Sequence, residues 1–82
     1  MKSKFLIQGR VQGIGFRYWV RRQFGKFNIK GEVWNNEDGT VGVECIGEEN
    51  EMEKMVKKLN EGPPLARVDK VDILKSNEDK AA

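Results

Sequence analysis

The residues best suited to chemistry lie in one run near the N-terminus, from Gly9 to Arg17 (GRVQGIGFR). Three glycines let the backbone curl so that successive amide N–H groups face one centre, and a following helix adds the positive end of its dipole. Arg17 would add a planar cation to the same centre. A positive charge in the first helical turn opposes the dipole, which favours a bound anion that offsets this cost. The alternative is that the glycines only make a tight turn and that Arg17 is a solvated surface charge.

Two familiar nucleotide-binding loops do not match this run. The mononucleotide loop requires Lys followed by Ser or Thr after its last glycine, whereas Phe16 and Arg17 follow Gly15 here. The dinucleotide fingerprint requires a glycine where this chain has Tyr18, and a parallel sheet too long for 82 residues. Nucleotide binding is therefore not predicted.

The composition limits the chemistry that the chain can supply. It has no histidine and a single cysteine, so neither the usual general base nor an ordinary zinc site is expected. The 15 basic and 13 acidic side chains are well mixed and leave a net charge of +2, so binding along a nucleic-acid backbone is not indicated. No apolar run is long enough for a signal or membrane segment, and a cytoplasmic protein is predicted. Chemistry must then come from arginine, amide and main-chain groups.

Apolar periodicity predicts a strand before this run and a helix after it. Residues 5–8 form the strand, and residues 16–27 form the helix, which ends at Asn28 because asparagine tolerates positive φ. The buried stripe of this helix comprises Phe16, Val20, Phe24 and Phe27.

A period of two follows and predicts a hairpin. Asn35 ends its first strand on the same face as Val33, and residues 36–39 (NEDG) have the composition of a turn. Taken alone, Asn35 is as consistent with a residue that caps its own turn as with a catalytic one. The second strand points Cys45 inward, so this residue is predicted to belong to the core and not to act as a nucleophile.

A second helix over residues 48–60 and a last strand over residues 68–75 complete the order β-α-β-β-α-β. This order predicts an α+β fold, the ferredoxin-like split βαβ sandwich, with two helices on one face of a four-stranded antiparallel sheet. We expect one domain over residues 1–76 and a frayed tail over residues 77–82.

Two blocks of the chain resemble the acylphosphatase family. The family signature Gly-x-Val-Gln-Gly-Val-x-Phe-Arg is matched from Gly9 to Arg17, with Ile14 in place of a valine. The family block Gly-Trp-Val-x-Asn-x-x-(Asp)-Gly-x-Val is similar to the residues from Gly31 to Val41. The spacing between the blocks also fits, and the resemblance runs from about Phe5 to Leu74.

The resemblance implies a reaction and assigns roles to residues. Members of this family hydrolyse acyl phosphates to a carboxylate and inorganic phosphate by direct attack of water, without a metal or cofactor. Asn35 falls on the catalytic asparagine, which would orient the water, and Arg17 falls on the substrate-binding arginine. The amides that would hold the phosphoryl oxygens belong to Gln12, Gly13, Ile14, Gly15 and Phe16. The implied partners are a small-molecule acyl phosphate and inorganic phosphate, with no nucleic acid, no membrane and a monomeric chain.

The chain departs from the family pattern in two places. Glu32 replaces the usual aromatic residue after Gly31, whereas Trp34 lies two positions later on the same strand face, so we expect the packing of that face to be preserved. Many family members also continue into a short apolar fifth strand, which residues 77–82 do not predict.

Two other functions are alternatives. The first is a non-catalytic module that binds anions or carbamoyl phosphate, similar to the acylphosphatase-like domain of the hydrogenase-maturation carbamoyltransferase. The second is an RNA-binding domain, which has the same order of elements. It is disfavoured because residues 40–46 lack the aromatic side chains that stack on bases.

Overall fold

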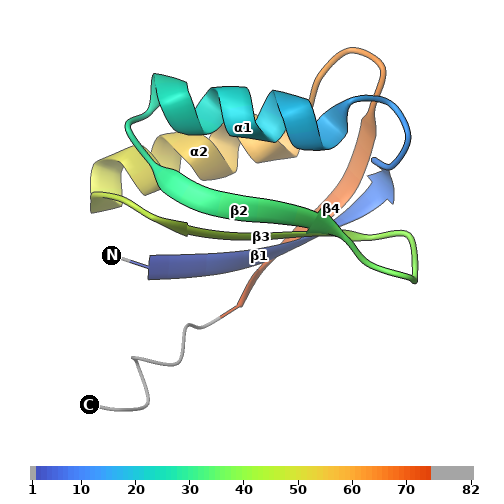
Figure 1. Cartoon of the computed structure of the whole chain (residues 1–82), viewed down its shortest axis with the longest axis horizontal. Helices are drawn as coiled ribbons and strands as arrows, with labels where there is room; N and C mark the ends of the chain where they lie inside the picture. The colour runs from blue at the N-terminus through green and yellow to red at the C-terminus, as the bar shows by residue number, and fades with distance from the viewer. Residues whose placement is uncertain (1, 75–82) are drawn as a thin grey trace.

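The computed structural model describes residues 2–74, and its elements follow the predicted order (Figure 1). The elements are β1 (Lys2–Arg10), α1 (Phe16–Lys26), β2 (Lys30–Asn35), β3 (Val41–Ile46), α2 (Glu49–Glu61) and β4 (Arg67–Leu74). The strands form one antiparallel sheet in the order β2-β3-β1-β4. Both helices cover the same face of this sheet (Figure 1). The predicted ferredoxin-like sandwich is therefore confirmed.

The core lies between the two layers because each element turns one apolar face toward the other layer. Its buried members are Phe5, Ile7, Val11, Phe16, Val20, Phe24, Ile29, Val33, Val41, Val43, Cys45, Met52, Met55 and Leu59. The stripe predicted for the first helix belongs to this set except for Phe27, which is partly buried at its margin. Cys45 is 1% exposed, which confirms it as a core residue.

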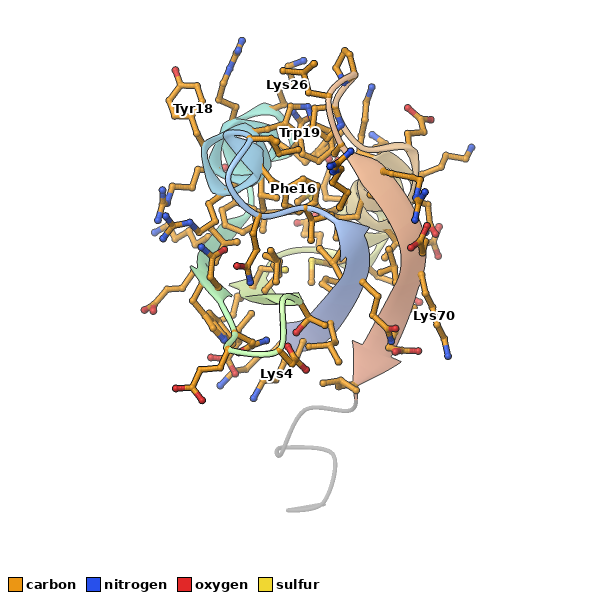
Figure 2. All side chains as sticks on the ribbon, turned by 90° about the vertical axis from the view of Figure 1, so that its right-hand side faces the viewer. Lys4, Phe16, Tyr18, Trp19, Lys26 and Lys70 are labelled. Atoms are coloured by element: carbon orange, nitrogen blue, oxygen red, sulfur yellow. The ribbon has the colours of Figure 1, made fainter. Side chains whose placement is uncertain are left out.

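The first strand is longer than predicted. β1 has nine residues, because it is a central strand that pairs with β3 on one side and β4 on the other. The strand begins before the position predicted from the sequence, because the charged residues Lys2 and Lys4 interrupt the apolar pattern. Figure 2 shows Lys4 on the sheet face that carries no helix, where a charged side chain stays in water.

The other boundaries agree with the prediction within one residue. α1 ends at Lys26, and Asn28 takes a left-handed φ of 55° as expected. α2 begins at Glu49, with Glu48 as its N-cap. The predicted end of the last strand at position 75 and the predicted tail over residues 77–82 lie outside the described residues. Neither helix within residues 2–74 is long and apolar enough to cross a membrane.

Candidate active site

The loop after β1 enters α1 through two glycines in the left-handed conformation. Gly13 has a φ of 79° and Gly15 has a φ of 80°, a conformation that residues with a side chain rarely adopt. Trp19 makes the first helical hydrogen bond, to the Gly15 carbonyl oxygen at 3.0 Å, so the amides of residues 16–18 have no acceptor within the helix. Gly15 is the N-cap, and no side chain caps this end of the helix. A left-handed residue followed by helical ones makes a concave set of N–H groups that suits an anion.

The two helices begin with opposite charges. α2 has Glu49 and Glu51 in its first turn, where carboxylates match the positive end of the helix dipole. α1 has no acidic residue in its first turn and has Arg17 there instead. An anion bound at this end would interact favourably with both the free amides and the guanidinium, which favours the predicted anion pocket.

A pocket of about 180 Å³ lies at this end of α1. Its lining residues are Val11, Gly13, Gly15, Phe16, Arg17, Tyr18, Arg21 and Asn35. The pocket therefore brings Arg17 of α1 together with Asn35 at the end of β2, which are the two predicted catalytic residues.

Of the other predicted site residues, some line this pocket and some do not. Gln12 and Ile14 are not among the lining residues, and Ile14 packs partly buried against the core. Phe16 lines the pocket, but the residue is 1% exposed and its ring centroid lies 5.6 Å from that of Trp19. Figure 2 shows the Phe16 ring between α1 and the sheet, so the ring belongs to the core. Phosphate binding by the amides of the loop stays a prediction.

The Gln12 side chain links the loop to the hairpin that carries Asn35. Its Nε2 donates hydrogen bonds to the main-chain carbonyl oxygens of Asn36 and Thr40, each at 2.9 Å. Both acceptors lie in the turn between β2 and β3. One side chain thus holds the loop against the end of β2.

Side chains around Asn36 hold the turn itself. Trp34 Nε1 donates to Asn36 Oδ1 at 3.0 Å, and Asn36 Nδ2 donates to Thr40 Oγ1 at 2.9 Å. The Thr40 hydroxyl and main-chain N–H both donate to Asp38 Oδ1, and these bonds lower the pKa of the Asp38 carboxyl below its ordinary value. The sequence indicated a turn here but gave no sign of these bonds, which depend on side-chain direction.

Trp34 also explains the departure from the family pattern. Its indole lies over Gly42, its cross-strand partner, where an added Cβ would overlap the ring. Lys4 Nζ lies 6.0 Å from the ring centroid. Trp34 is half-buried and Glu32 is exposed, so the tryptophan supplies the packing on this face of the sheet.

Three lining residues, Val11, Tyr18 and Arg21, were not predicted as site residues, and Val11 is a buried member of the core. Arg21 follows Arg17 by one helical turn on the same face, and this spacing could have identified it. Figure 2 shows the Tyr18 side chain pointing away from the sheet, which is a position that apolar periodicity does not mark. The lining holds two arginines and no carboxylate, so the pocket is positively charged.

The one thiol lies apart from this pocket. Burial, with a smaller contribution from Glu44, raises the pKa of Cys45 to about 11, so the thiol keeps its proton at neutral pH. Within residues 2–74, no group of three or more His, Cys, Asp or Glu residues could hold a metal ion. The arrangement suits anion binding and the positioning of water.

A family model described as acylphosphatase matches residues 3–82. The chain belongs to the acylphosphatase family. It is similar to the acylphosphatase of Archaeoglobus fulgidus, with 43% identity over 70 residues that make up 85% of this chain and 79% of that one. The crystal structure of acylphosphatase from Bacillus subtilis is similar with a TM-score of 0.88 and 33% identity, covering 93% of this chain and 84% of that chain. The T. kodakarensis HypF structure has a TM-score of 0.77 and 33% identity, covering 94% of this chain and 11% of that chain.

Proposed function

We propose that this protein is an acylphosphatase that hydrolyses acyl phosphates to a carboxylate and inorganic phosphate, with Arg17 and Asn35 as its catalytic residues. The observation that supports this proposal is that both residues line one pocket at the helix end whose first amides lack acceptors. Membership of the acylphosphatase family supports the same reaction.

The phosphoryl group would bind against the amides of residues 12–16, with the Arg17 guanidinium across its oxygens. Amides at a helix N-terminus and a planar guanidinium are both suited to phosphate. Donors fixed in place stabilise the charge of the transition state without reorganising during the reaction. The same donors would bind inorganic phosphate as the product and as a competitive ligand.

Asn35 would hold the attacking water through its side-chain amide. The water oxygen forms a bond to phosphorus while the bond from phosphorus to the acyl oxygen breaks, and the carboxylate leaves with that electron pair. A phosphate oxygen accepts the proton of the water, and a carboxylate leaves readily, so no strong base is required. This mechanism uses only groups that a chain without histidine contains.

We further propose that the protein acts as a cytoplasmic monomer on small-molecule acyl phosphates, without a cofactor, nucleic acid or membrane partner. The near balance of 15 basic and 13 acidic residues disfavours binding along a polyanion.

Hydrolysis of benzoyl phosphate tests the proposal. We expect Arg17→Gln to lower kcat/KM by about 10²–10³-fold, the scale seen when one donor to a transition-state oxyanion is lost, and to remove inhibition by inorganic phosphate. We expect Asn35→Ala to lower kcat by about 10²-fold and to keep that inhibition, because it positions the water and not the phosphate. Arg22→Gln is the matched control, since it removes a neighbouring cation that does not line the pocket.

Two results would contradict the proposal. Unchanged kcat/KM in both the Arg17 and Asn35 variants would remove these residues from the mechanism. A wild-type protein that binds inorganic phosphate without turnover would indicate the non-catalytic anion-binding module, whose fold the HypF structure shares.

A further inference from the structure

The pocket contains a second cation that the proposed mechanism does not use. Arg21 lines it together with Arg17, one turn further along α1. Four residues of helix advance about 6 Å along the axis, so the two arginines lie on one face at successive levels. Within residues 2–74, no ion pair includes Arg21, and no carboxylate lines the pocket.

Two like charges at this spacing destabilise a helix slightly unless an anion lies near them. The amides at the helix start and Arg17 suffice for one phosphoryl group, and they lie at the N-terminal end of the pocket. Arg21 is therefore placed beyond the phosphoryl group, on the side to which the rest of a substrate can extend. The pocket volume of about 180 Å³ leaves space for more than a phosphoryl group, because a single water needs roughly 15 Å³ by the same measure.

We propose that Arg21 forms a subsite for the acyl portion of the substrate, and that it favours acyl phosphates that carry a second anionic group such as a terminal carboxylate. The inference rests on the proposed function. A short dicarboxylic acyl chain spans the separation between the levels of Arg17 and Arg21, so its two ends can meet the two guanidinium groups. Each guanidinium offers a fork of N–H donors that matches a carboxylate or phosphate.

The size of the preference follows from the exposure of Arg21. Its side chain is exposed to solvent, where an ion pair is screened by water and salt. A pair of this kind corresponds to a preference of about two- to five-fold in kcat/KM. The preference should decrease as the ionic strength rises.

Succinyl phosphate and its monomethyl ester test this subsite, since they share the four-carbon acyl chain and differ in the terminal charge, with the uncatalysed breakdown of each subtracted. In the wild-type protein we expect kcat/KM to be about two- to five-fold higher for succinyl phosphate. In Arg21→Gln the ratio of the two kcat/KM values should fall to about one. Arg22→Gln should keep the wild-type ratio, because Arg22 is an exposed cation of the same helix that does not line the pocket.

The outcomes separate this inference from the proposed function. Equal loss of activity on both substrates in Arg21→Gln would mean that Arg21 acts on the phosphoryl group, and the subsite would be rejected. An unchanged ratio in Arg21→Gln would also reject it, while hydrolysis itself would still support the enzyme. Absence of hydrolysis of both substrates in the wild-type protein would overturn the proposed function and the subsite together.

Discussion

The side-chain amide of Gln12 donates a hydrogen bond to the main-chain carbonyl oxygen of Asn36, 2.9 Å away. The same nitrogen donates to the Thr40 carbonyl oxygen at 2.9 Å. These bonds connect the glycine loop with the turn that follows Asn35, so the two sides of the pocket are held in register by a residue that does not line it. The side chain of Gln12 therefore has a positioning role.

Gln12→Ala is expected to lower kcat/KM about ten-fold on benzoyl phosphate, because small displacements of positioned groups are costly in rate. Gln8→Ala is the matched control. Gln8 lies in β1, shortly before Gln12, and its side chain donates a hydrogen bond to Asp72 at 3.1 Å, away from the pocket. Each variant should lose about 1 kcal/mol of unfolding free energy per bond removed, measured by urea denaturation. Equal activity in the two variants would argue against a positioning role.

The glycine at the start of α1 provides a second comparison. Gly15→Ala should cost about 1–2 kcal/mol in stability, because its φ of 80° is unfavourable for alanine, and should weaken phosphate binding by distorting the loop. Gly25→Ala lies within the same helix with nothing within 4 Å of the new Cβ, and should stabilise the protein by about 0.5–1 kcal/mol. Thermal unfolding and inhibition by phosphate measure the two effects. Phosphate binding of wild-type strength in Gly15→Ala would count against the amide cradle.

Inorganic phosphate should stabilise the folded protein. At a concentration ten times its Kd, a ligand that binds only the folded state contributes about 1.4 kcal/mol. For a domain of this size that corresponds to a rise in Tm of roughly 5–10 °C. Arg17→Gln should lose this rise, whereas Asn35→Ala should keep it. Chloride at matched ionic strength is the control, and an equal rise with chloride would show a general salt effect.

We expect the free energy of unfolding to decrease at alkaline pH because the Cys45 thiol is buried. The pKa of Cys45 is raised from 9.0 to about 11 in the folded state, so between these values the unfolded chain loses a proton that the folded chain keeps. The stabilisation is complete below pH 9 and declines by roughly 1.4 kcal/mol per pH unit as the pH rises toward 11. Urea unfolding of the wild-type protein and Cys45→Ala at several pH values checks this. A difference between them that stays constant from pH 8 to pH 11 would contradict the assignment.

The elements of the fold could be predicted because their apolar periods are clear and their ends carry specific residues. The apolar stripe that starts at Phe16 and the helix-ending Asn28 predicted the position of α1. The glycine in the turn, Gly39, predicted the hairpin. Gln23 was missed as a core residue because it is polar, although it is 4% exposed. Its Nε2 donates to the Trp19 carbonyl oxygen at 3.3 Å, a contact that the sequence alone does not indicate.

The lining of the pocket was easier to predict for residues that lie in one segment than for residues that different segments bring together. The loop and Arg17 lie in one motif, and the resemblance supplied Asn35. Arg21 could have been found from its spacing of one helical turn from Arg17, but the sequence alone does not show that both residues line one pocket. The hydrogen bonds from Gln12 to the turn depend on how the loop lies against the hairpin, which no motif or periodicity indicates.

The outer margin of the sheet has a consequence for concentrated solutions. Within residues 2–74, β4 has a strand neighbour on one side only, and it carries the ion pairs Arg67–Asp69 and Lys70–Asp72. Another copy of the chain adding to this side would have to strip hydration from four charged groups before any main-chain bonds could form. Mixed charge along this edge strand therefore disfavours edge-to-edge association of copies of the chain through β4.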